Sequence, residues 1–146
     1  MSTEQLEVLE QLARRAMACK RWRWIPGMLA HTGLRIVRHD SDGYLVGYFA
    51  NHAYISTCIN DVWTDAPDNT VDCLPDFRDP ATMGCLLALV REAWGPEATV
   101  SVNISGFWAV GGARIQTGKS AGHTINLGIW KATEVEALVA ALEAAP

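Results

Sequence analysis

The sequence predicts an α+β fold in which an antiparallel β-sheet packs, sandwich-like, against about three α-helices. Three segments repeat apolar residues at helical spacing, whereas the segments between them alternate apolar and polar residues and are broken by turn-forming pairs such as Asp42-Gly43. The resulting order of helix, three strands, helix, three strands and helix is typical of an antiparallel sheet with separate helices.

The chain's 146 residues suit a single domain spanning residues 1–146 with a core of its own. Apolar residues make up 49% of the sequence and charged residues 19%, which excludes a disordered chain. No apolar run approaches the roughly 18 residues of a membrane span, and Met1–Glu10 lacks the basic-then-apolar order of a secretory signal, so residence in the cytoplasm is expected. The net charge of −4 argues against general nucleic-acid binding.

The first and third helices are predicted from apolar spacing and from a capping signal. The first is expected from Thr3 to Cys19, with a core face formed by Leu6, Leu9, Ala13 and Ala16. The third begins at Thr133, which forms a capping box with Glu136. Its core-facing residues are expected to be Val135, Leu138, Val139 and Leu142.

The second helix is expected from Pro80 to Trp94. Asp79 is a suitable N-cap, Pro80 occupies a helical position that needs no N–H, and Gly95 ends the helix. The segment is apolar nearly all round, and such helices are usually buried on several sides. We therefore expect it to be the most buried helix and to pack on the sheet through Leu86, Leu87 and Val90.

Strands are expected in the remaining segments. In chain order they are Leu34–Arg38, Tyr44–Phe49, Ala53–Ile59, Thr99–Ile104, Phe107–Val110 and Thr124–Ile129. Asp42-Gly43 is a hairpin signal between the first two, and Ser105-Gly106 turns the chain between the fourth and the fifth. Gly111-Gly112 indicates a bulge or a close approach of backbones.

No residue pattern predicts a metal or catalytic centre. The four cysteines lack C-x-x-C spacing and are expected to be reduced thiols: Cys19, Cys58, Cys73 and Cys85. Neither a nucleophile elbow nor a paired Cys/His signature occurs. No catalytic residue, metal ligand or cofactor is therefore assigned.

A basic and aromatic segment is the first candidate for holding an anionic, nucleotide-like ligand. It contains Arg21, Trp22, Arg23 and Trp24, whose guanidinium groups suit phosphates and whose indole faces suit bases. In the alternative interpretation, the tryptophans anchor the first helix to the sheet and the arginines face solvent.

A glycine-rich segment is the second candidate. Arg114, Lys119 and His123 lie in a stretch that nearly matches a phosphate-binding P-loop, but Ala113 occupies the position of the required leading glycine. The segment also leads into a strand pattern rather than a helix. It is either a plain hairpin loop or a site where backbone N–H groups hold an anion.

Residues Asn60–Asp79 form a long acidic segment without the spacing of a calcium-binding loop. The segment is either a solvated loop or a surface for a partner. Residues 41–80 carry a net charge of −6 and residues 1–40 a net charge of +3. This split charge and the six tryptophans predict a homo-oligomer, most simply a two-fold dimer.

Three stretches resemble small phage and prophage accessory proteins, some of them assigned to phage sandwich-type α/β domains: Trp22–Met28, Leu74–Gly95 and Thr133–Pro146. The resemblance is carried by helix caps and core faces, so no functional residue follows from it. It implies a phage origin and residence in the cytoplasm of a bacterial host, where such proteins often antagonise host defence.

Three functional hypotheses follow. The first is a non-enzymatic phage accessory binding protein, in its sharpest form a counter-defence sponge for a small nucleotide signal. The second is a protein–protein inhibitor of a host defence protein that works through the acidic segment. The third is a small hydrolase whose site no motif identifies.

Overall fold

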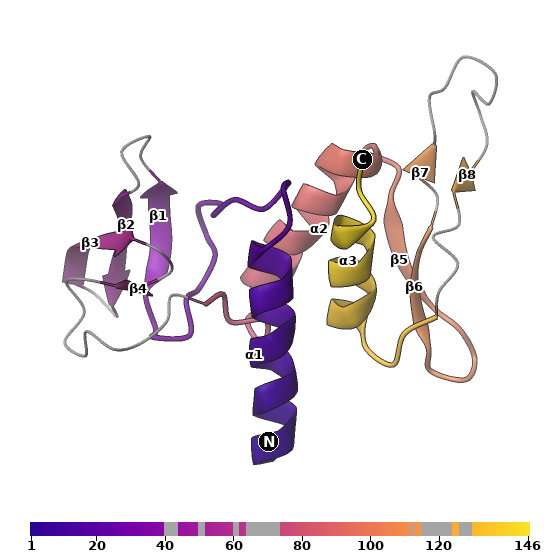
Figure 1. Cartoon of the computed structure of the whole chain (residues 1–146), viewed down its shortest axis with the longest axis horizontal. Helices are drawn as coiled ribbons and strands as arrows, with labels where there is room; N and C mark the ends of the chain where they lie inside the picture. The colour runs from indigo at the N-terminus through magenta and orange to yellow at the C-terminus, as the bar shows by residue number, and fades with distance from the viewer. Residues whose placement is uncertain are drawn as a thin grey trace. The chain divides into compact units, whose positions relative to one another are not determined.

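Three helices and short antiparallel sheets make up the described part of the chain, which confirms the α+β class (Figure 1). The computed structural model describes residues 1–39, 44–49, 52–59, 62–63, 74–111, 113–114, 124–125 and 130–146. The chain divides into two units, the first comprising residues 1–17 and 23–85 and the second residues 18–22 and 86–146. The single domain and the sandwich-like layering stay predictions, and each unit is described by itself.

Helix α1 (Thr3–Met17) opens the first unit and ends two residues before the expected end. Ser2 and Gln5 cap it reciprocally: the Ser2 N–H donates to Gln5 Oε1 at 2.9 Å, and the Gln5 N–H donates to Ser2 Oγ at 3.2 Å. Its buried residues are Leu12, Ala13 and Ala16. The expected core face is therefore confirmed in the second half of the helix, whereas Leu6 is 38% exposed.

Four strands of the first unit form an antiparallel sheet in the order β1 (Arg35–His39), β2 (Tyr44–Phe49), β3 (His52–Ile59) and β4 (Val62–Trp63). The three strands expected in this region are confirmed to within one residue, and Asp42-Gly43 lies outside the described residues. The register of β1 and β2 shifts after the pair Ile36–Gly47. A Cβ at Gly47 would overlap the carbonyl oxygen of Arg35, so only glycine allows the two backbones to approach this closely.

Strand β1 presents Arg35 to the start of helix α2 (Pro80–Trp94), which has the predicted bounds. The guanidinium forms a bidentate ion pair with Asp79, with Nη1–Oδ2 at 2.8 Å and Nη2–Oδ1 at 3.0 Å. Asp79 Oδ2 also accepts hydrogen bonds from the backbone N–H and the hydroxyl of Thr82, each at 2.9 Å. The predicted role of Asp79 as an N-cap is therefore confirmed.

Two further hydrogen bonds tie this ion pair to the chain before β1. Arg35 Nη1 donates to the carbonyl oxygen of Gly27 at 2.9 Å, and the Leu29 N–H donates to Thr82 Oγ1 at 2.8 Å. The hydrogen bonds from Arg35 lower the pKa of Asp79 to about 2; burial opposes this shift, and the bonds from Thr82 add to it. Asp79 is therefore charged at neutral pH.

The second unit contains the hairpin of β5 (Thr99–Val102) and β6 (Trp108–Gly111), followed by the short pair β7 (Ala113–Arg114) and β8 (Thr124–Ile125). The two strands expected for the hairpin are confirmed, with β5 shorter by two residues. The Gly111-Gly112 bulge and most of the last expected strand include residues outside the described ones.

Helix α3 (Glu134–Glu143) packs on β6 and β5. Its N-cap, Thr133, accepts a hydrogen bond from the Glu136 N–H at 3.2 Å, and Glu136 Oε2 accepts one from the Ala132 N–H at 3.2 Å. This confirms the capping box, with the glutamate bonded one residue before the cap. All four predicted core residues are buried: Val135, Leu138, Val139 and Leu142.

The expectation that α2 is the most buried helix is wrong. Six of the ten residues of α3 are buried, against four of the fifteen residues of α2. Within α2, Leu86 and Val90 are buried as expected, but the third large buried side chain is Leu89, and Leu87 is only half-buried. Because α2 is apolar nearly all round, its sequence contains no polar face that would indicate which leucine points inward.

The burial difference between these two leucines predicts unequal effects of substitution. Leu89→Ala should lower the free energy of unfolding by about 2–5 kcal/mol, because it leaves a cavity. Leu87→Ala removes the same atoms from a half-buried position and should cost under about 2 kcal/mol. Urea denaturation of both variants measures the difference, and equal losses would contradict the burial described.

The pKa of Asp79 predicts a loss of stability in acid. Because the carboxyl pKa is lower in the folded chain, its contribution is complete above the ordinary Asp value of about 4 and is lost as the pH falls toward 2. Asp79→Asn keeps a good N-cap but removes the charge, at a cost of about 1–3 kcal/mol near neutral pH. Urea denaturation should show this cost shrinking below pH 4, and a cost independent of pH would count against the ion pair.

Candidate functional site

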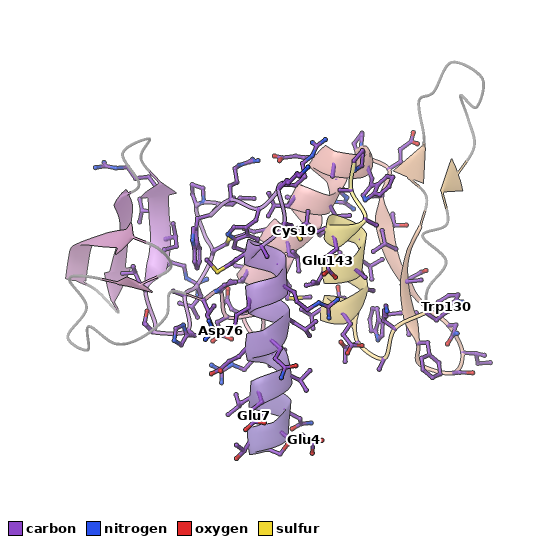
Figure 2. The ribbon with its side chains drawn as sticks, in the orientation of Figure 1. Glu4, Glu7, Cys19, Asp76, Trp130 and Glu143 are labelled. Atoms are coloured by element: carbon purple, nitrogen blue, oxygen red, sulfur yellow. The ribbon has the colours of Figure 1, made fainter. Side chains whose placement is uncertain are left out.

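A pocket of about 220 Å³ lies in the first unit, between α1 and the segment that leads into α2. Figure 2 shows Asp76, which belongs to that segment, beside α1. The pocket is lined by Leu6, Leu9, Glu10, His31, Leu74, Pro75, Asp76, Phe77 and Arg78. Five of these side chains are apolar, so the pocket combines an apolar wall with a few polar groups.

Backbone pairing fixes the wall opposite α1. The His31 N–H donates to the carbonyl oxygen of Leu74, and the Asp76 N–H donates to the carbonyl oxygen of Leu29, each at 2.8 Å. These bonds flank an antiparallel bridge between Ala30 and Pro75. His31 and Asp76 are therefore held on neighbouring extended segments that lie far apart in the sequence.

Asp76 and Arg78 form an ion pair at the pocket. Arg78 Nε and Nη2 each donate to a carboxylate oxygen of Asp76 at 2.8 Å, and the Arg78 backbone N–H donates to Oδ1 at 3.0 Å. Burial of Asp76 opposes its ionisation, but the hydrogen bonds from Arg78 outweigh this effect and lower the pKa of the carboxyl. Asp76 is thus an ionised, compensated carboxylate at neutral pH, which is unsuited to act as a general acid.

The remaining polar groups of the pocket are His31 and Glu10. Nδ1 of His31 lies 3.3 Å from the nitrogen and 3.2 Å from the oxygen of Leu74, whereas its Nε2 makes no hydrogen bond to the described part of the chain. Glu10 forms no ion pair with any described residue. Among the described residues that line the pocket, the uncompensated charge is therefore negative.

The basic and aromatic segment predicted to bind a ligand is divided between the units. Arg21 and Trp22 belong to the second unit and Arg23 and Trp24 to the first. Arg21 Nε and Nη2 donate to the main-chain oxygen of Pro146 at 3.2 and 3.1 Å. Trp24 is only 6% exposed, which favours the alternative interpretation of that side chain as a core anchor.

The glycine-rich candidate falls largely outside the described residues. Arg114 belongs to β7, while Lys119 and His123 lie outside the described ranges. The anion site predicted there stays a prediction.

The expectation of reduced thiols is met for two of the four cysteines. Cys19 and Cys85 are free thiols, and burial, together with the nearby charge of Asp79, raises the pKa of Cys85. In the described ranges, no three His, Cys, Asp or Glu side chains are grouped as a metal site would require. No described helix has the length and apolar character needed to cross a membrane.

Sequence reasoning missed the pocket as a site. It assigned Leu6 and Leu9 to the core and treated Asp76 as one member of a long acidic segment. The available signal was the alternation of apolar and charged residues from Pro75 to Arg78, which is typical of an extended segment with one covered side. Only the tertiary structure brings that segment against α1.

Comparison with known proteins assigns no role to this pocket. No family model matches the chain, and no curated protein or solved structure matches it either. The resemblance to phage accessory proteins stays a prediction, and the site is interpreted from its own residues.

The burial of Trp24 predicts a structural role that can be measured. Trp24→Ala should lower the free energy of unfolding by about 3–5 kcal/mol, because it removes a large buried side chain. Arg23→Ala, at the exposed neighbouring position, should change it by less than about 1 kcal/mol. Urea denaturation distinguishes the two cases, and a Trp24→Ala variant as stable as the parent chain would return Trp24 to the list of exposed ligand-binding candidates.

Proposed function

We propose that this protein is a non-enzymatic binding protein that covers a partner protein, and that the pocket beside α1 receives an apolar side chain from a basic segment of that partner. One observation carries the proposal: the described lining of the pocket is mainly apolar, and its uncompensated charge is the carboxylate of Glu10. Such a combination suits an apolar anchor flanked by Lys or Arg.

The size of the pocket supports a side chain as its occupant. At about 220 Å³ it is smaller than the roughly 300–1,000 Å³ of pockets that hold drug-sized ligands. A nucleotide of several rings would protrude from it. Leu74 and Phe77 are already buried, so an anchor side chain would mainly cover the exposed parts of Leu6 and Leu9. Burial of such apolar surface is the main source of binding energy at interface anchors.

The charge of α1 supports a basic partner. Glu4 and Glu7 lie on the N-terminal turns of the helix (Figure 2), and Glu10 follows one turn after Glu7. None of the three carboxylates makes an ion pair with a described residue. Lys or Arg side chains of a partner would be attracted to this face, chiefly by faster association.

The inhibitor hypothesis is better supported than the nucleotide sponge. The guanidinium of Arg21 is already bonded to the main chain at Pro146, and the Trp24 ring is buried. The segment Leu74–Arg78, by contrast, lies within the acidic stretch Asn60–Asp79 that the inhibitor hypothesis assigned to a partner. If the resemblance to phage accessory proteins holds, the partner is a protein of the bacterial host.

Fluorescence anisotropy with three sets of short labelled peptides tests the proposal. One set carries a central Leu, Phe or Trp flanked by Lys and Arg, the second replaces the basic residues with Glu, and the third replaces the anchor with Ala. The first set should bind at least about tenfold more tightly than the others, and its affinity should fall as salt is added.

Glu10→Lys should weaken binding of the basic, anchored peptides by about tenfold or more. Glu4→Lys is the matched control: it makes the same change in net charge on the same helix outside the pocket lining, so it should slow association but weaken binding less than Glu10→Lys. The proposal fails if the three sets bind alike or if the two variants weaken binding equally. Calorimetric binding of cyclic dinucleotides or ADP-ribose derivatives, weakened by Arg21→Ala, would favour the sponge instead.

A further inference from the structure

We infer that the outer edge of β5 is the docking surface for a second copy of this chain, so that two hairpins join into one continuous antiparallel sheet. The inference concerns the second unit and does not rest on the function proposed for the pocket of the first.

The hydrogen-bonding pattern of the hairpin leaves one edge of β5 open. The N–H and C=O of Trp108 bond to Lys131, at 2.8 and 2.7 Å, and therefore point away from β5. Opposite residues of an antiparallel pair are alternately hydrogen-bonded and not hydrogen-bonded to each other. Val102, which lies opposite Trp108, therefore directs its own N–H and C=O away from β6, and Val100 does the same. These four groups make no hydrogen bond to any described residue.

Apolar side chains gather at the turn end of the same hairpin. Val102 is 51% exposed, Ile104 is fully exposed and Phe107 is 46% exposed. Trp130, labelled in Figure 2, is 47% exposed as well, but it precedes Lys131, which bridges to Trp108 on the side of β6 opposite the open edge of β5, so Trp130 does not line that edge. Large apolar side chains that cluster at one exposed place typically mark an interaction surface.

This edge lacks the features that usually prevent strands from pairing with other chains. Between Glu97 and Arg114 the sequence has neither a charged residue nor a proline, although exposed edge strands are commonly protected by one or the other. A second copy presents the same neutral edge. Two chains of net charge −4 can therefore meet here without placing like charges opposite one another.

A two-fold axis at Ser101 satisfies all of the open groups. It would place Val100 of each copy opposite Val102 of the other, in hydrogen-bonded pairs that use both N–H and both C=O groups of each strand. Such an interface is closed, because each β5 has only one open edge. The expected product is a dimer rather than a filament.

Sedimentation and light scattering test the oligomeric state. The parent chain should have twice the 15.9 kDa chain mass at micromolar concentration. Val102→Lys and Ile104→Asp, which place charge at the exposed edge, should both give monomers. Val8→Lys introduces the same charge at an exposed valine of α1 and should remain a dimer.

Hydrogen exchange then shows whether β5 itself is the interface. In the parent dimer the amides of Val100 and Val102 should be protected, and Ile104→Asp should abolish that protection. The Ser101 amide, which faces β6, should stay protected in both proteins and so report an intact hairpin. A monomeric parent chain, or a dimer in which the Val100 and Val102 amides exchange freely, would overturn the inference.

Discussion

The ion pair between Arg35 and Asp79 is the interaction on which the first unit depends. It joins strand β1 to the first turn of α2, and through Gly27 and Thr82 it also holds the chain that precedes β1. A partly buried ion pair of this kind adds little stability over an apolar pair of similar shape, but removal of one partner leaves an unpaired charge inside the protein. Its main effect is therefore to specify one arrangement of strand and helix.

The candidate pocket inherits its geometry from that arrangement. Thr82 Oγ1 accepts a hydrogen bond from the Leu29 N–H, and the Leu29 carbonyl oxygen accepts one from the Asp76 N–H. These hydrogen bonds connect the start of α2 to the pocket wall. The ion pair with Arg78 balances the charge of Asp76, so the net charge of the described pocket lining is that of Glu10 on α1. The same residues therefore determine both the shape of the pocket and its charge, which makes the pocket the strongest candidate for a recognition site in the first unit.

The second unit presents a different kind of surface. Six of the ten residues of its helix α3 are buried. The hairpin, in contrast, has backbone N–H and C=O groups without partners among the described residues, and exposed apolar side chains at an edge without charged residues. The pocket would recognise a partner by an apolar anchor and charge, whereas the edge would recognise another strand by backbone hydrogen bonds. These two proposed modes rely on different chemistry, so neither proposal depends on the other.

The sequence by itself determined the α+β class, the bounds of α2, its Asp79 cap, the capping box at Thr133 and the first hairpin strands, because these features depend on neighbouring residues. Only the tertiary structure decided that Leu89 rather than Leu87 is buried and that Trp24 lies in the core. A helix that is apolar all round, or tryptophans that alternate with arginines, carry no signal for which side chain points inward. The same holds for the pocket and for the open edge of β5. Their residues are brought together, or left without partners, by contacts between segments distant in the chain, which local spacing does not encode.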